Sequence, residues 1–307
     1  MPEADSIHRA AAALRTALVD HKMLRFESPK LVGVTPRAGR TIESVESHGK
    51  HLEVIWDDAV VLHTNMRMSG SWHLYRKDES WQRPHHEMRV LIEVTGWNAV
   101  CFNAPVVETF RMPDASRHPG LGGVGPDLCR TDADLGRCVE LLLAHDQPRA
   151  TLADVLLDQR IFCGLGNVYR CEVLWAGRLS PFAAVGDLPE LDAVRLVNVA
   201  AKLLRANLHH AETITVPGVK RGPAVYGRNG QPCQRCGETI ESRCHGAHRQ
   251  TLYWCPGCQV RLDPRKRRED TPTMDPHPAA QRFLDDLVRT RETRRHVTGG
   301  LTSRRVS

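Results

Sequence analysis

The sequence predicts a multidomain α+β protein, in which a leading helix and an N-terminal β-sandwich precede a helical domain and a zinc-binding β-hairpin. Three features carry this prediction. Strand-length apolar or alternating segments fill residues 41–102, a helical period replaces them over residues 131–212, and two CxxC pairs lie within residues 233–258. The expected divisions are residues 1–115, 131–222, 223–260 and a basic flexible tail at 261–307.

The leading helix is predicted from an apolar stripe formed by Ile7, Ala11, Leu14 and Leu18. Proline is favoured in the first helical turn, and an acidic side chain such as Glu3 suits the positive end of the helix dipole. Taken alone, this segment indicates an amphipathic helix and nothing more.

The β-sandwich is predicted from three stretches, residues 41–56, 59–75 and 88–102. Each alternates or runs apolar over strand lengths, with Gly, Asp and Pro between the segments. A Gly- and Pro-rich stretch at residues 117–127 then predicts a linker.

The helical domain follows from a change of period. The helical segments lie at residues 134–145, 150–162, 167–177 and 191–208. We expect the second of these helices to run into the turn Gly164-Leu165-Gly166, and the third to begin at Asn167. Backbone N–H groups and the helix dipole would converge there, an arrangement that binds phosphate, although such a turn also serves simply for close packing.

Charge and composition exclude some classes of protein. The 307 residues are 41% hydrophobic and contain no apolar run of about 18 residues. The N-terminal segment carries His8, Arg9 and Arg15 instead of a secretory signal, so we expect a cytosolic protein without a membrane partner. The net charge is +6, but residues 261–307 hold 12 Lys and Arg against 7 Asp and Glu, so basicity alone is weak evidence for DNA binding.

The ten cysteines fall into two groups. Five are scattered through apolar or helical segments of the sequence and are expected to be small buried hydrophobes: Cys101, Cys129, Cys138, Cys163 and Cys171. Five are crowded into residues 233–258, which in a cytosolic protein indicates a metal.

The pairs Cys233/Cys236 and Cys255/Cys258 supply four thiolates on two tight turns, the closed tetrahedral shell of one structural Zn²⁺. A redox pair is the alternative, and Cys244, His245 and His248 between the pairs could compete as ligands. Between the pairs we expect a β-hairpin whose tip carries Arg249, either beside a phosphate or in solvent.

Seven motifs occur in one order along residues 1–260. They are MPE at the start, GK at 49–50, MSG at 68–70, VGPDL at 124–128, LLDQxxxxGLGN at 156–167, VYGRNGQPCxxCG at 225–237 and YWCPGCQ at 253–259. Together they resemble the bacterial formamidopyrimidine-DNA glycosylase and endonuclease VIII family. The resemblance implies a helix-two-turn-helix domain, damaged double-stranded DNA as the partner, a monomer, and a bacterial cytoplasmic location at the nucleoid.

The resemblance gives the first residues a chemical role. After removal of Met1, Pro2 becomes a secondary amine with a pKa of roughly 8, so it can be a nucleophile near neutral pH. It implies that Pro2 attacks the deoxyribose C1′ and that Glu3 protonates the sugar ring oxygen. Lys50 matches the family's catalytic lysine; without that match, Glu3 would be a helix cap and Lys50 a solvated charge.

The resemblance also implies contacts with DNA. Asn167 would bind backbone phosphate, and Arg249 or its neighbour would do so from the zinc hairpin, Arg249 as part of the catalytic assembly. Met68 matches the wedge that fills the space left by the flipped nucleotide, although packing in the core is the alternative for a methionine.

Several positions depart from the family pattern. Ala4 replaces a usual glycine, and Ser6 stands where a second glutamate is common. The 18 residues between the CxxC pairs exceed the usual spacing, and Gln250 takes the position expected for the arginine at the finger tip.

The substrate prediction rests on two missing features. Residues 100–112 lack the Arg-x-Phe pair of the purine-specific branch, and only about a dozen residues separate HHAE from VYGR. This short spacing leaves no room for the long loop that covers a flipped purine in the purine-specific branch. The absence of the Arg-x-Phe pair and of this loop favours oxidised pyrimidines and the endonuclease VIII branch.

Three alternatives stay open: a formamidopyrimidine glycosylase acting on oxidised purines, a zinc-containing DNA-binding protein without catalysis, and a zinc ribbon that binds other proteins.

Overall fold

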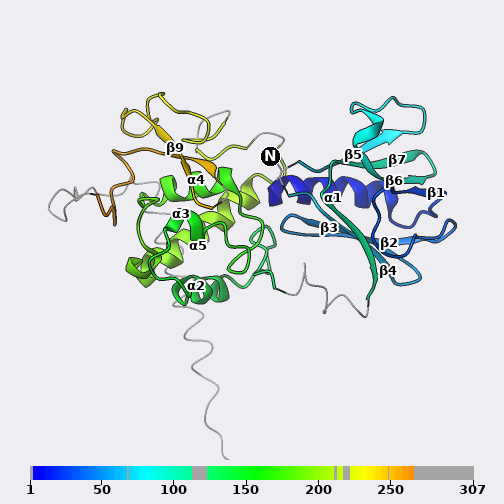
Figure 1. The fold of residues 1–307 in the computed structure, drawn as a ribbon, viewed down its shortest axis with the longest axis horizontal. Coiled ribbons are helices and arrows are strands. Elements are labelled where there is room, and N and C mark those ends of the chain that lie inside the picture. Colours follow the sequence, from blue (N-terminus) through cyan, green and yellow to red (C-terminus); the bar gives the residue numbers. More distant parts are fainter. Residues whose placement is uncertain are drawn as a thin grey trace, which may run out of the picture. The chain divides into compact units, whose positions relative to one another are not determined.

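The computed structural model describes residues 3–67, 69–112, 123–210, 213–216, 222–247 and 249–265. Helices and antiparallel strands occupy separate stretches of the chain, which confirms the α+β class (Figure 1). Pro2, Met68, His248 and almost all of the tail at 261–307 lie outside the described residues.

Two four-stranded antiparallel sheets form the N-terminal sandwich. One sheet has the order β1 (Arg25–Glu27), β6 (Met88–Val94), β7 (Trp97–Phe102), β5 (Ser71–Arg76). The other has the order β2 (Ile42–His48), β3 (His51–Trp56), β4 (Val60–Asn65), β8 (Val106–Arg111). A short 3₁₀ helix, η1 (His85–Glu87), precedes β6. The three strand-rich stretches expected over residues 41–102 contain the strands β2 to β7, and β1 and β8 lie outside those stretches.

Helix α1 (Ala4–Leu18) packs against both sheets. Its predicted stripe is confirmed, since Ile7, Ala11, Leu14 and Leu18 are all buried. These side chains share one core with alternate residues of the strands, among them Leu52 and Val54 of β3 and Ile92 of β6. Burial of this stripe therefore fixes α1 to the sandwich, and with it the position of Glu3 at the start of the helix.

The second domain contains four helices among the described residues. They are α2 (Leu135–Leu143), α3 (Leu152–Val155), α4 (Asn167–Ala176) and α5 (Glu190–Ala206), with a 3₁₀ turn, η3 (Val185–Asp187), before α5. Helix α4 begins at Asn167 as predicted.

The prediction that a helix would run over residues 150–162 into the glycine turn was wrong, because α3 ends at Val155. The Gln159 side chain donates to the carbonyls of Leu157 and Leu165 at 3.0 Å each and accepts from the Gly164 amide at 2.9 Å. These bonds stabilise a succession of turns in place of further helix, since they satisfy backbone groups that a helix would pair internally.

The C-terminal hairpin consists of β9 (Glu241–His245) and β10 (Gln250–Trp254), with Arg249 in the connecting turn at φ 48°. Leu252 and Trp254 of β10 are buried in the same core as the helices. The Trp254 ring meets Phe182 edge-on at 5.1 Å. The hairpin is thus packed on the helical domain by its own apolar residues.

The five scattered cysteines are all buried, which confirms the expectation that they behave as small hydrophobes. None of these five belongs to the C-terminal cysteine cluster described below.

The sandwich and the helical domain meet through a very close backbone approach. The Ala4 amide donates to the Gly164 carbonyl at 3.2 Å, and a Cβ on Gly164, whose φ is +94°, would collide with the Ala4 Cβ. Ala4, one of the departures from the family pattern, therefore fills the space that Gly164 leaves open.

Replacing Gly164 by alanine should destabilise the protein more than the same replacement at an equally strained but uncrowded position. Gly39 is the matched control, because its φ is +86° and no atom lies within 4 Å of its Cβ position. Gly39→Ala should cost about 1–2 kcal/mol from backbone strain. Gly164→Ala should cost about 1–3 kcal/mol more from overpacking. Urea unfolding measures both, and equal losses would contradict the importance of the Ala4 contact.

Candidate active site

Glu3 lies at the junction of two helices. Its backbone precedes α1, and its side chain reaches the N-terminus of α4, where Oε1 accepts from the Val168 amide at 2.8 Å and Oε2 from the Tyr169 amide at 3.3 Å. Gly166 leaves the space for this carboxyl group, because a Cβ there would meet Oε1 at 2.5 Å. The free N–H groups at the start of α4, directly after the glycine turn, therefore bind a protein carboxyl group.

Ser6 holds the backbone of Glu3. The Glu3 amide donates to the Ser6 hydroxyl at 3.1 Å, and that hydroxyl donates to the Glu3 carbonyl at 2.8 Å. Ser6, which departs from the family pattern, thus fixes the start of α1 through a local capping interaction.

The Glu3 carboxyl group is suited to proton transfer near neutral pH. Burial raises its pKa from 4.5 to about 7, and Asp5 adds to the rise. The Lys50 ammonium and the Val168 and Tyr169 amides oppose this shift by stabilising the carboxylate. A general acid works best when its pKa lies near the working pH, and Glu3 meets that condition.

Lys50 occupies the tight turn between β2 and β3, at the edge of the sandwich next to Glu3. Burial lowers the pKa of its ammonium group, and the Glu3 carboxylate opposes that change. The Lys50 carbonyl accepts from the Met66 amide at 3.2 Å, and the Met66 carbonyl accepts from Gly70 at 2.9 Å. The lysine turn is thereby connected to the loop that carries Met68.

A cavity of about 630 Å³ opens beside Glu3. It is lined from α1, the sandwich and the start of α4, and its polar lining includes Glu3, Asp5, Arg9, Arg83 and Asn103. The sequence analysis did not identify Arg83, which lies in an irregular segment between β5 and β6 and offered no periodicity or motif.

Asn167 is buried, with both polar ends of its side chain engaged within the protein. Its amide nitrogen donates to the Thr251 carbonyl at 2.9 Å, and its oxygen accepts from Arg170. The side chain thus ties α4 to β10 and to the next turn of its own helix.

Four cysteines converge on one point. Cys233, Cys236, Cys255 and Cys258 form a group that could hold a metal ion. The sulfur atoms of Cys233 and Cys258 lie 3.8 Å apart, and those of Cys236 and Cys255 lie 3.4 Å apart. With metal–sulfur bonds of about 2.3 Å, a tetrahedral shell has edges close to these distances. Cys244 is exposed and stands outside the group.

Comparison with known proteins identifies the class. The N-terminal domain model of formamidopyrimidine-DNA glycosylase matches residues 1–105, and its H2TH domain model matches residues 124–217. These matches define a DNA glycosylase of base excision repair with abasic-site lyase activity. The chain belongs to the formamidopyrimidine-DNA glycosylase and endonuclease VIII family, as its motifs predicted.

Two curated relatives cover most of the chain. A probable endonuclease 8 2 of Streptomyces coelicolor is 36% identical over 86% of this chain and 96% of its own length. The DNA-(apurinic or apyrimidinic site) lyase Nei2 of Mycolicibacterium smegmatis is 33% identical over 85% of this chain and 99% of its own length.

Solved structures share the fold. Lactococcus lactis Fpg bound to DNA containing an oxidised pyrimidine aligns with a TM-score of 0.72 at 20% identity, over 84% of this chain and 100% of that one. A second complex, of LlFpg with THF-DNA and an inhibitor, aligns with a TM-score of 0.71 at 21% identity, over 84% and 99% of the two chains. None of the described helices combines the length and apolar character needed to cross a bilayer.

Protein stability should fall as pH rises through the titration of Glu3. The folded state holds this proton up to about pH 7, whereas the unfolded chain releases it near pH 4.5. The resulting stabilisation is full below pH 4.5, is lost on the way to pH 7, and amounts to about 3 kcal/mol. Glu3→Gln should remove this component of the pH dependence, as measured by urea unfolding at a series of pH values.

Glu43→Gln is the control, since Glu43 is an exposed carboxylate on β2. A Glu3→Gln variant whose unfolding free energy follows pH as the wild type does would show that Glu3 titrates normally in the folded protein.

Proposed function

We propose that this chain excises oxidised pyrimidines from double-stranded DNA through an N-terminal proline Schiff base and then cleaves the strand by β,δ-elimination. The observation that carries the proposal is the Glu3 carboxyl group, buried at the start of α4 with a pKa of about 7 and coupled to Lys50. An acid with this pKa, directly following a proline, is suited to a reaction in which a sugar ring must be opened.

The proposed reaction begins when the neutral Pro2 nitrogen attacks C1′ of the flipped nucleotide and the bond from C1′ to the base breaks. The base leaves with the electron pair of that bond and takes up a proton, while the Pro2 nitrogen loses its own proton. Glu3 donates its proton to the ring oxygen, the bond from C1′ to that oxygen breaks, and an iminium links Pro2 to C1′. Loss of a C2′ proton then allows the 3′ phosphate to leave, and a second elimination releases the 5′ phosphate.

We assign the remaining predicted residues to binding and positioning. Lys50 would hold a phosphate or the lesion beside Glu3, and Asn167 and Arg249 would meet the DNA backbone. Because the Asn167 side chain is engaged with Thr251 and Arg170, its contact with phosphate would require an exchange of partners. Met68 would fill the space left by the flipped nucleotide.

The preference for pyrimidines is supported by the short segment before the cysteine cluster and by the missing Arg-x-Phe pair. The naming of several relatives as endonuclease 8 also favours this branch. The four cysteines would hold one structural Zn²⁺, which would fix the β9–β10 hairpin and Arg249. We retain the domain division 1–115, 131–222, 223–260 and 261–307, a monomeric state and a cytoplasmic, nucleoid location as parts of the proposal.

Borohydride trapping tests the chemistry. Incubation with abasic-site DNA and reductant should give a covalent adduct, because hydride reduces the iminium to a stable amine. Pro2→Gly should abolish trapping, and Glu3→Gln should reduce the rate of excision by about 10²–10⁴-fold. With base-containing duplexes, thymine glycol should be trapped faster than 8-oxoguanine. Binding without any adduct would favour a non-catalytic DNA-binding protein, and the reverse lesion order would favour an oxidised-purine glycosylase.

Metal analysis tests the cysteine site. The protein should contain about one zinc ion per chain, and Cys255→Ser should lose it, because one missing thiolate opens a closed shell. DNA affinity should fall about tenfold or more as the hairpin loses its order. Cys244→Ser is the matched control, since Cys244 lies on β9 outside the four-cysteine group. Unchanged zinc content in Cys255→Ser would contradict the assignment.

A further inference from the structure

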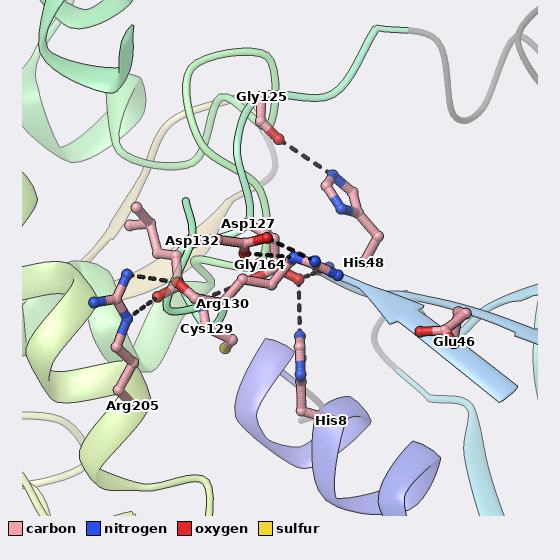
Figure 2. Close-up of polar contacts among 12 residues, drawn as sticks. His8, Glu46, His48, Gly125, Asp127, Cys129, Arg130, Asp132, Gly164 and Arg205 are labelled. Atoms are coloured by element: carbon pink, nitrogen blue, oxygen red, sulfur yellow. Dashed lines mark hydrogen bonds and ion pairs between the residues drawn. The ribbon is translucent and has the colours of Figure 1, made fainter. Parts of the chain in front are cut away.

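Asp127 connects three separate parts of the chain through one carboxylate (Figure 2). Oδ2 accepts from His8 Nε2 of α1 at 2.8 Å and from the Gly49 amide of the β2–β3 turn at 2.8 Å. Oδ1 accepts from the Cys129 amide at 2.9 Å. Since the Asp127 side chain is fully buried, these three donors replace the water that the carboxylate gives up.

The carboxylate remains charged in this environment. Burial alone would raise the pKa of Asp127, but the hydrogen bond and charge of His8, together with the Gly49 and Cys129 amides, outweigh burial and hold the pKa below its usual value. His48 and Cys163 also lie near the carboxylate, and His48 donates to the Gly125 carbonyl at 3.3 Å.

The same side chains could be considered as a metal site, since His8, Asp127 and Cys129 lie within 4.8 Å of one another. The hydrogen bonds argue against that assignment. Both oxygens of Asp127 are already engaged by N–H donors, and burial together with the Asp127 charge raises the pKa of the Cys129 thiol far above neutrality, which disfavours a thiolate ligand.

The segment that carries Asp127 is itself tied to the turn before α4. The Gly125 amide donates to the Gln159 carbonyl at 2.7 Å, and the Cys163 amide donates to the Pro126 carbonyl at 3.1 Å. Gly49, at φ +57°, packs directly on Cys163, because a Cβ at Gly49 would lie 2.8 Å from the sulfur atom. Asp127 therefore joins the β2–β3 turn to the part of the helical domain that positions Glu3.

Gly49 immediately precedes Lys50, so the bond from its amide to Asp127 fixes the turn from which the lysine side chain extends. We infer, on the basis of the proposed function, that Asp127 is a positioning residue. Its bond to the Gly49 amide holds Lys50 beside Glu3, and His8 of α1 holds Asp127 in place. Glu3 interacts electrostatically with both Lys50 and Asp5, so displacement of the lysine changes the charge balance at the acid.

Asp127→Asn tests this inference in the full-length protein. Asparagine keeps the size of the side chain but puts an NH₂ group against one of the N–H donors, so the Gly49 turn should loosen. Single-turnover cleavage of abasic-site DNA should slow by about 10- to 100-fold, since small misplacements of a catalytic group cost this much. Binding to DNA containing an uncleavable tetrahydrofuran site should weaken less than cleavage slows, since Lys50 is only one of the residues assigned to the DNA.

Two further readouts separate positioning from loss of folding. Because Lys50 lowers the pKa of Glu3, its displacement should move the alkaline limb of the pH–rate profile to higher pH. Hydrogen exchange should be faster at the Gly49 amide, whatever the activity. Asp132→Asn is the control, because Asp132 is an exposed carboxylate of the same segment and accepts hydrogen bonds from Arg130.

If Asp127→Asn folds poorly, His8→Phe removes one donor and leaves the carboxylate in place. It should shift the alkaline limb in the same direction by a smaller amount. An unshifted limb, or unchanged exchange at Gly49, would overturn the inference. An inactive wild type would instead reject the proposed function, and the exchange measurement would still decide whether Asp127 anchors the turn.

Discussion

The structure depends on one buried carboxyl group at the junction of two domains. Glu3 starts α1, which is fixed to the sandwich by its apolar stripe, and its side chain caps α4, the helix at the centre of the second domain. Free N–H groups and the helix dipole favour a negative charge there, whereas burial opposes it. Burial outweighs the stabilisation of the carboxylate and raises the pKa to about 7, so the group can carry or release a proton close to neutral pH.

Close backbone packing makes that balance possible. Gly164 and Gly166 allow the chain to pass next to Ala4 and Glu3 without a side chain between them. This close packing keeps the Glu3 carboxyl group buried, although Glu3 also belongs to the lining of the cavity. The glycine turn is both a packing device and a site for an anion, and in this chain the anion in contact with it is the protein's own carboxylate.

Lys50 and Asp127 extend the same arrangement into the sandwich. The charge of Lys50 counteracts the effect of burial on Glu3, and the turn that carries it is bonded to Asp127 of the neighbouring segment. The pKa of the acid therefore depends on how the β2–β3 turn is held. This gives a physical reason for the hydrogen bonds between the domains, such as those from Ala4 to Gly164 and from Gly49 to Asp127, to lie close to Glu3 and Lys50.

The sequence by itself determined the α+β class, the three strand-rich stretches, the start of α4 and the four-cysteine group, because each depends on local periodicity or on the spacing of a few residues. It failed for α3, where the bonds of the Gln159 side chain replace a helix with turns, and for Arg83, whose local sequence offers no signal. Strand β8 was missed although its residues VVETFR favour a strand. Only the tertiary structure decided that Glu3 caps α4 and that Asp127 holds the Gly49 turn. Those bonds join residues more than 70 positions apart, and their strength comes from burial, which exists only once the two domains have packed together.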